Sequence, residues 1–394
     1  MSRWPEVRLE DVFDVARGGS PRPIDSFITD DPNGVNWIMI GDASEGSKYI
    51  SSTKKRIIKE GVKKSRMVSA GDFLLTNSMS FGKPYILKTS GCIHDGWLVL
   101  SPRHDQIHSD FFYHLLGSDV VYSKFKKLAA GAVVKNLNSE LVRGVLIPLP
   151  PLAEQKRIAA ILDKADAIRR KLQESLRLSD DFLRSVFLDM FGDPVTNPKG
   201  WPIVTIRDLL VATSYGTSKK ASETDGQFPC LRMNNITYSG GWDFKSLKYV
   251  DLDKHEQSKN LVHAGQLLFN RTNSKELVGK TAVYRRKEAM AFAGYLVRGI
   301  ANSQADTEYI SAYLNLPHGK AVLQGMCKNI IGMANINAEE FKSIRIQKPP
   351  VTLQKQFAAI VHSTELKKTT LNKFITESET LFSSLQQRAF RGEL

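Results

Sequence analysis

The chain has few cysteines and no long apolar run. Its three cysteines, Cys92, Cys230 and Cys327, lie far apart among 394 residues, and none belongs to a C-x-x-C pair. This scarcity argues against a disulfide framework and against a cysteine zinc site, and it is typical of a reducing cytoplasm. No apolar stretch approaches the roughly 18 residues that cross a bilayer, and the first residues show no signal-peptide pattern. We therefore expect a cytoplasmic protein that does not bind membranes.

Patterns that carry catalysis are also scarce. Val278–Thr281 is similar to the end of a phosphate-binding loop, but the position five residues before Gly279 holds Ser274, so the first backbone turn around a phosphate is missing. His104 and His108 have ligand-like spacing, but the second half of the chain has no counterpart, which favours a solvated loop. Neither a glycine-rich methyl-donor loop nor an acidic nuclease cluster is evident. We expect a binding protein with no catalytic residues, metal or cofactor of its own. An enzyme with an unrecognised site is the alternative.

Positive charge is abundant and unevenly distributed. Lys and Arg number 55 against 41 Asp and Glu, which gives a net charge of +14. Residues 1–150 carry +4, residues 151–193 carry zero, residues 194–348 carry +8 and residues 349–394 carry +2. A basic protein of this kind suggests a polyanionic partner such as nucleic acid. The two basic blocks are separated by a neutral segment, so we expect two separate binding regions.

The sequence contains a tandem repeat with a period of about half its length. Similar pieces follow one another in the same order at offsets close to 197 residues. The pairs include Trp4–Pro5 with Trp201–Pro202, Gly82–Lys83 with Gly279–Lys280, Gly96–Val99 with Gly294–Val297, Asn136–Asn138 with Asn335–Asn337, and Ile147 with Ile346. The ordered series predicts a duplicated fold.

The two basic blocks have the pattern of α+β domains. Short β-like runs stand between Gly, Asn and Ser residues, and short helices are predicted in both blocks. The expected strands are Val35–Ile40, Gly96–Leu100, Val145–Leu149 and Lys280–Arg285, and the expected helices are Asp110–Leu116 and Glu308–Leu314. We expect recognition domains at 1–150 and 194–348, each followed by a long helical segment, at 151–193 and 349–394.

Each repeat ends in a predicted long helix with an apolar seam whose steps alternate between three and four residues. The seam residues are Ile158, Ile161, Ile168, Leu172, Phe182 and Val186 in the first helix, and Phe357, Ile360, Leu371, Phe374, Leu381 and Leu385 in the second. Roughly 38 residues would span ~57 Å, more than a domain needs for its own core. The shared register favours an intramolecular antiparallel coiled coil over two helices that pack separately.

Loops rich in Arg, Lys, Asn, Ser and Tyr occur in both repeats. Such residues contact phosphates and base edges, and the loops differ in identity where the surrounding scaffold matches. The DNA-binding candidates are Arg17, Ser20, Arg22, Asn77, Ser78, Ser80 and Lys83 in the first repeat, and Tyr215, Lys219, Lys220, Arg232, Asn234, Asn270, Arg271, Asn273, Lys275 and Lys280 in the second. This pattern predicts two readers of different DNA sequences.

Three further segments carry a resemblance to a known family. They are the Pro-rich lead-in Ile147–Gln155, the Phe-Gly-Asp-Pro run at Phe191–Pro194, and the C-terminal Gln387–Leu394. With the repeated plan they resemble the specificity subunit of a type I restriction-modification system, over the whole chain. The second lead-in, Lys348–Gln354, is a degraded copy.

The resemblance implies a prokaryotic protein in which each domain reads half of a split DNA sequence and the paired helices set the gap. It also implies two methyltransferase subunits that modify adenine with S-adenosylmethionine, and motor-nuclease subunits that use ATP and Mg²⁺. Those cofactors would belong to the partners. A duplicated DNA-binding protein that acts alone, as a regulatory or architectural factor, is the alternative.

Overall fold

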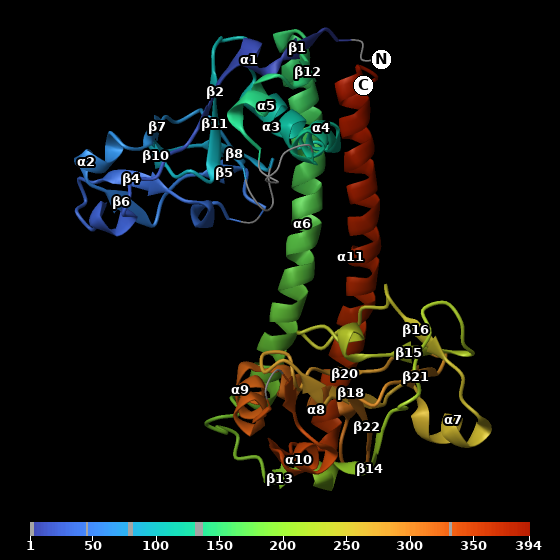
Figure 1. Ribbon diagram of the computed structural model, residues 1–394. Helices are drawn as coiled ribbons and strands as arrows, with labels where there is room; N and C mark the ends of the chain where they lie inside the picture. Colours follow the sequence, from blue (N-terminus) through green and yellow to red (C-terminus); the bar gives the residue numbers. More distant parts are fainter. Residues whose placement is uncertain (1–3, 45, 78–81, 131–136, 331–332) are drawn as a thin grey trace. The chain divides into compact units, whose positions relative to one another are not determined.

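The computed structural model describes residues 4–44, 46–77, 82–130, 137–330 and 333–394. The chain divides into two compact units: unit 1 is Met1–Gln173 with Lys373–Leu394, and unit 2 is Glu174–Asn372. Both units combine helices with short strands, which confirms the predicted mixed class (Figure 1). The division falls inside the two long helices, so each unit contains part of both.

Unit 1 contains twelve named strands and five short α-helices among its described residues, with 3-10 helices at Ile24–Ser26 and Ile40–Asp42. The strands are β1 Glu6–Arg8, β2 Phe13–Arg17, β3 Ile28–Thr29, β4 Val35–Ile38, β5 Tyr49–Ile50, β6 Lys55–Ile57, β7 Arg66–Val68, β8 Phe73–Thr76, β9 Pro84–Leu87, β10 Gly91–Ile93, β11 Trp97–Pro102 and β12 Leu146–Pro148. The short helices are α1 Leu9–Val12, α2 Lys59–Val62, α3 Ser109–Leu116, α4 Asp119–Ala130 and α5 Ser139–Arg143.

The central sheet of unit 1 is covered on both faces. Its order is β2-β11-β8-β9-β5, beside a second sheet β3-β6-β4-β10-β7 and the pair β1-β12. In β8, Phe73 and Leu75 join the core that contains α3, α4 and α5, whereas Leu74 joins a core on the opposite side. Because successive side chains of a strand point to opposite faces, a doubly covered strand is apolar throughout.

Unit 2 has a similar content. Its strands are β13 Ile203–Thr205, β14 Leu210–Tyr215, β15 Phe228–Leu231, β16 Lys248–Val250, β17 Leu261–Val262, β18 Leu267–Asn270, β19 Thr272–Asn273, β20 Thr281–Val283, β21 Met290–Phe292, β22 Leu296–Ala301, β23 Lys328–Ile330, β24 Met333–Asn335 and β25 Arg345–Gln347. Its short helices are α7 Lys254–Asn260, α8 Thr307–Asn315, α9 Pro317–Met326 and α10 Ala338–Ser343. The sheets are β13-β25, β14-β22-β18-β20, β16-β15-β21-β17 and β19-β24-β23.

The strand pairing repeats between the units. The antiparallel order β2-β11-β8-β9 of unit 1 recurs as β14-β22-β18-β20 in unit 2. The parallel pair β4 and β10 recurs as β15 and β21, and the antiparallel pair β1 and β12 recurs as β13 and β25. The repeat in the sequence is therefore also a repeat of the fold. The six short elements expected from the sequence are all present, with ends shifted by up to two residues.

The two long helices are α6 Leu152–Phe191 and α11 Val351–Arg391, and a buried glutamine fixes the start of each. The Gln155 side chain accepts from the His108 backbone N–H at 2.9 Å and donates to the Pro150 carbonyl at 2.9 Å. Gln354 makes the same two bonds, with the Asp306 N–H and the Pro349 carbonyl, both at 2.9 Å. The degraded second lead-in therefore keeps the residue that joins the helix to its domain.

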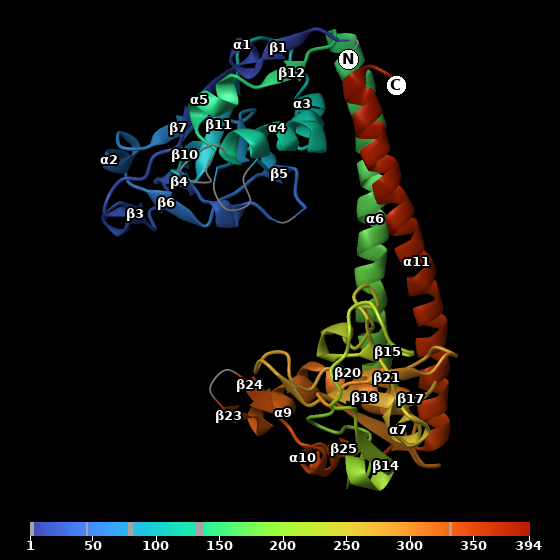
Figure 2. The same cartoon turned by 45° about the vertical axis from the view of Figure 1, so that its right-hand side comes forward.

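Within each unit the two long helices lie side by side and run in opposite directions (Figures 1 and 2). In unit 1, Ile158 and Leu162 of α6 share a core with Phe382 of α11. In unit 2, the ring of Phe187 of α6 lies 5.5 Å from that of Phe357 of α11. The beginning of one helix thus packs with the end of the other. Among the described residues, no helix combines the length and apolarity that crossing a bilayer requires.

Of the twelve predicted seam residues, eight are buried or half-buried and four are exposed. Ile158 and Phe357 are buried, and Ile161, Leu172, Val186, Ile360, Leu371 and Leu385 are half-buried. Ile168, Phe182, Phe374 and Leu381 are instead between 48% and 58% exposed. Leu162, Val361 and Phe382, each one residue beyond a predicted seam position, are buried.

Polar residues explain this shift of register. Arg169 lies on the inner face of α6, with its guanidinium carbon 4.9 Å from the centre of the Phe382 ring, and it is paired with Asp166 at 2.6 Å. In unit 2, the Lys368 ammonium of α11 bonds to Asp180 of α6 at 2.8 Å. Paired charges can occupy a helix interface, but a count of apolar residues does not detect them.

Candidate nucleic-acid interface

One predicted loop in each unit begins at a position where only glycine fits. The Gly18 N–H donates to the Trp97 carbonyl at 2.9 Å, and the Gly216 N–H donates to the Leu296 carbonyl at 3.3 Å. A Cβ on either glycine would lie 2.1 Å from a carbonyl oxygen of the facing backbone, which is far inside contact distance. The residue before each glycine ends its strand, so Arg17 in unit 1 and Tyr215 in unit 2 occupy matching positions.

A second pair of matching positions is fixed by the connection after β8 and β18. The Leu137 N–H donates to the Asn77 carbonyl at 3.0 Å, and the Ile336 N–H donates to the Arg271 carbonyl at 2.8 Å. The N–H groups of Asn77 and Arg271 likewise donate to matching carbonyls, at 3.1 and 3.0 Å. Asn77 and Arg271 therefore stand at equivalent places in the two units.

In unit 1, four candidates gather around Asp95. The Arg17 Nε and Asn77 Nδ2 atoms both donate to the Asp95 carbonyl, at 3.2 and 2.7 Å. The Ser20 hydroxyl donates to the Asp95 carboxylate at 2.8 Å, and the Arg22 guanidinium lies 3.9 Å from it. The hydrogen bond from Ser20 is the main cause that lowers the pKa of Asp95. Asp95 was not among the predicted site residues, because an acidic side chain is not one of the Arg, Lys, Asn, Ser and Tyr types expected to contact DNA.

In unit 2, Arg271 and Tyr215 form a stacked pair. The guanidinium carbon of Arg271 lies 4.8 Å from the centre of the Tyr215 ring, and its Nη2 is 3.4 Å from the Asn335 side-chain oxygen. Asn335 in turn donates to the Thr272 hydroxyl at 2.9 Å, and the Tyr215 hydroxyl accepts from the Ala338 N–H at 3.0 Å. Residues from four elements thus converge here, and Asn335 was not among the predicted site residues.

The other candidates differ in exposure. Lys83, Lys220, Asn234 and Lys275 are exposed, and Asn273 is half-buried. Lys219 is exposed but pairs with Glu256 at 2.5 Å, and Arg232 donates to the Ser246 carbonyl at 2.8 Å. Ser78 and Ser80 lie outside the described residues.

Two candidates are buried and do not belong to the surface. Lys280 is 6% exposed, and its ammonium donates to the carbonyls of Met233 and Ile236 at 2.8 and 2.6 Å. Burial lowers its pKa. Asn270 is fully buried, and its side-chain oxygen accepts from the Thr272 N–H at 3.2 Å. Both side chains hold the loops in place, so the prediction that they contact DNA is corrected.

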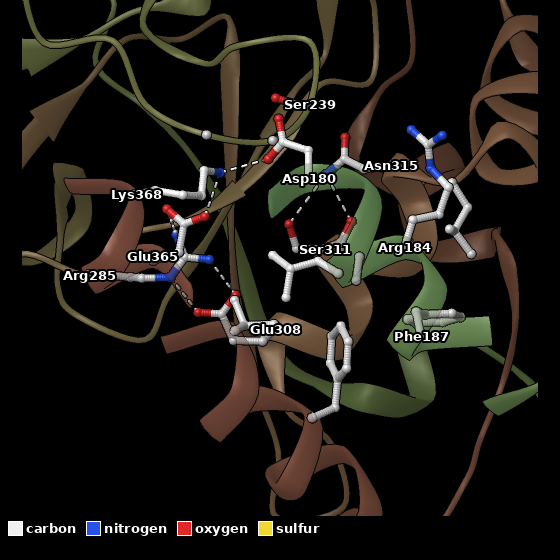
Figure 3. A pocket seen from close by; sticks show the side chains of 17 residues that line it. Asp180, Arg184, Phe187, Ser239, Arg285, Glu308, Ser311, Asn315, Glu365 and Lys368 are labelled. Atoms are coloured by element: carbon white, nitrogen blue, oxygen red, sulfur yellow. Dashed lines mark hydrogen bonds and ion pairs between the residues drawn. The ribbon is translucent and has the colours of Figure 1, made fainter. Parts of the chain in front are cut away.

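A buried charge cluster joins α8 and the end of β20 to α11. Arg285, just after β20, donates from Nε and Nη2 to the two carboxylate oxygens of Glu308 on α8, both at 2.6 Å (Figure 3). The His362 Nε2 atom of α11 lies 3.1 Å from the same carboxylate. The hydrogen bond with Glu308 raises the pKa of His362, and the negative charge of Glu308 adds to this effect. The partial burial of His362 opposes it.

The cluster continues along the helices. The Lys368 ammonium lies between Asp180 of α6 and Glu365 of α11, at 2.8 Å from each, and Glu365 is 3.8 Å from Arg285 (Figure 3). These residues line a cavity of about 110 Å³. The charges fix α8 and the β20 end on the helices, which sets the orientation of the domain within unit 2.

Unit 1 has a comparable cluster with different residues. The Lys48 ammonium lies 2.6 Å from Asp110 of α3 and 3.0 Å from Asp163 of α6, and His114 Nε2 lies 2.8 Å from Asp163. Burial lowers the pKa of His114 more than Asp163 raises it. Within the described ranges, no three or more His, Cys, Asp or Glu side chains are arranged to hold a metal ion.

The fold therefore defines a protein with two similar modules. The strands of the two modules pair in the same order, but the polar side chains in their loops differ. Sequence comparison is consistent with this class. The model of the family described as "Type I restriction modification DNA specificity domain" matches residues 1–178 and again residues 198–379. The chain belongs to that family and contains its domain twice.

Similarity to individual proteins extends over most of the chain. It is 23% identical to the EcoKI specificity subunit of Escherichia coli K12 and 22% identical to the StySPI specificity subunit of Salmonella potsdam, each covering 89% of this chain and 80% of the relative. The solved S subunit from M. genitalium has the same fold, with 14% identity, a TM-score of 0.55, and 99% and 96% of the two chains covered. A chain from a solved type I R-M system gives a TM-score of 0.58 at 17% identity, over 99% and 98% of the chains. The family match and these similarities confirm the resemblance found in the sequence.

Proposed function

We propose that unit 1 and unit 2 each read one half of a split double-stranded DNA sequence, and that the chain directs partner subunits to that site. The observation that carries this proposal is that equivalent positions of the repeated fold hold different polar residues. Arg17 and Asn77 stand in unit 1 where Tyr215 and Arg271 stand in unit 2. Two readers of different sequences need one scaffold and different contacts. The positive charge of both recognition blocks suits a phosphate backbone.

The long helices are the proposed spacer. We propose that α6 and α11 form an antiparallel coiled coil with pseudo-two-fold symmetry, whose length sets the gap between the half-sites. The core that Ile158 and Phe382 share in unit 1, and the packing of Phe187 against Phe357 in unit 2, support this arrangement.

The exposed apolar side chains of the helices are the proposed docking sites for methyltransferase subunits. They are Ile168, Leu178, Phe182 and Leu188 on α6, and Leu366, Phe374 and Leu381 on α11. A contiguous exposed apolar patch is typical of a protein interface, and the proposal requires these side chains to form such patches. Two similar surfaces on one chain would hold two copies of one partner. S-adenosylmethionine, ATP and Mg²⁺ would then be bound by the methyltransferase and motor-nuclease subunits, and this chain would perform neither methyl transfer nor cleavage.

An adenine-methylation map of the host genome, with and without the gene, tests the proposal. We expect one bipartite motif to disappear when the gene is removed. Asp95→Ala should change the bases read in one half only, because it removes the carboxylate that accepts from Ser20 and faces Arg22. Asn335→Ala should change the other half only. Loss of both halves with either variant would contradict two separate readers. Failure of a methyltransferase to co-purify with the chain would favour a DNA-binding protein that acts alone.

A further inference from the structure

We propose that Arg271 is the residue by which unit 2 selects a guanine, and that Tyr215 is its positioning residue. This inference rests on the proposed function and adds to it the base that one side chain recognises.

The Arg271 guanidinium is restrained before any DNA is bound. It is stacked 4.8 Å from the centre of the Tyr215 ring, and Nη2 lies 3.4 Å from the Asn335 side-chain oxygen. The Nε atom is buried and has no hydrogen-bond partner among the residues that the structure describes. A flexible arginine loses rotamer freedom when it binds, whereas a restrained one has already lost it, so the restraint favours a contact of defined geometry.

Tyr215 is itself held at two ends. Its backbone pairs with Val297 in β22, and its hydroxyl accepts from the Ala338 N–H at 3.0 Å. Ala338 is the first residue of α10, whose N-cap Asn337 accepts from the N–H groups of Glu339 and Glu340, both at 2.9 Å. The ring is therefore a fixed platform for the guanidinium.

The chemistry of the free donors selects guanine. Because Nε is buried, the outward edge of Arg271 carries the Nη1 and Nη2 hydrogens, and Asn335 takes only one of them. Two neighbouring N–H donors match the O6 and N7 acceptors of guanine in the major groove. Adenine offers N7 beside an amino donor, and arginine has no acceptor with which to bind that donor.

A phosphate contact is the competing role, and the same loop offers a residue better suited to it. Lys275 is exposed, and a lysine bears a point charge that needs no fixed geometry. Unit 1 has no guanidinium at the equivalent position, because Asn77 stands there with its amide bound to the Asp95 carbonyl at 2.7 Å. We therefore expect this guanine preference in the half-site of unit 2 alone.

The experiment is selection of bound duplexes from a randomised DNA library by the full-length chain and its variants. Arg271→Ala should lower discrimination at one guanine by roughly 5- to 150-fold, the equivalent of about 1–3 kcal/mol, and leave the other half-site unchanged. Arg271→Lys keeps the charge and loses the planar fork, so it should keep general affinity and lose the guanine preference. Tyr215→Leu should weaken that preference, and Tyr215→Phe, which retains the ring, should weaken it less.

Lys275→Ala is the matched control. It should weaken all sequences about equally and reduce the salt dependence by about one ion. If Arg271→Ala behaves in that way, or if Arg271→Lys keeps the full guanine preference, Arg271 contacts phosphate and the inference is wrong. If the unaltered chain enriches no bipartite sequence, the proposed function fails, and the inference fails with it.

Discussion

Replacing Arg285 with methionine should destabilise unit 2 by about 3–5 kcal/mol. Arg285 donates to both oxygens of Glu308 at 2.6 Å, and the Glu308 side chain is only 4% exposed. Methionine keeps most of the apolar stem and removes both donors, which leaves the carboxylate buried beside His362. Removal of one partner from a buried ion pair costs about 3–5 kcal/mol because the remaining charge is desolvated, and here only the His362 contact is left to compensate it.

Two control variants separate this cause from a general loss of packing. The double variant Arg285→Met with Glu308→Gln removes both charges, so its stability should return close to that of the original chain. Arg103→Met breaks an exposed pair with Asp14 in unit 1, at 45% and 67% side-chain exposure, and should cost less than about 1 kcal/mol.

Hydrogen exchange followed by mass spectrometry resolves the two units in one experiment. A loss of 3 kcal/mol corresponds to roughly 150-fold faster exchange in α8, with α3 of unit 1 unchanged. Unchanged exchange in α8, a double variant no more stable than the single one, or an equal loss of protection in α3 would refute the buried ion pair as the cause.

The remaining predictions concern the spacer, pH and the loop frame. Four residues inserted after Gln173 and four after Asn372 lengthen both helices by ~6 Å. A methylation map should then show a gap between the half-sites that is one or two base pairs longer. An unchanged gap or altered half-site bases would mean that the helices are not the spacer. Because the pKa of His362 is raised above 6.5, its contribution to the stability of unit 2 is full below pH 6.5 and is lost as pH rises through the raised value. The lowered pKa of His114 makes unit 1 lose stability as pH falls below 6.5, and hydrogen exchange at several pH values should show opposite trends in the two units. Gly216→Ala places a Cβ 2.1 Å from a carbonyl oxygen, so it should lower the free energy of unfolding by at least about 1–3 kcal/mol. A methylation map should show that it alters only the half-site of unit 2. An unaltered motif together with an unaltered melting temperature would count against the close approach of the two backbones.

The sequence by itself determined the repeat, the long helices and the family. These features depend on local patterns, such as the spacing of apolar residues, the Pro-rich lead-ins and the order of matching segments, and they can be read along the chain. The short strands and helices were also predictable, because Gly, Asn and Ser residues mark where they stop. The match of one family model to both halves agrees with the duplication.

Only the tertiary structure decided which face of each helix is buried and which loop residues reach the surface. The apolar pattern placed Ile168 and Leu381 inside the helix pair, but both side chains are more than half exposed. The inner face holds the next residue of each helix instead, Arg169 against Phe382. Lys280 and Arg271 are both basic residues of one loop region, but the strand connections bury the ammonium of the first and leave the second stacked on Tyr215. Asp95 gained its role from groups that lie up to 78 residues away in the chain. Burial and hydrogen bonding between distant segments depend on chain folding, and no local pattern of residue types encodes them.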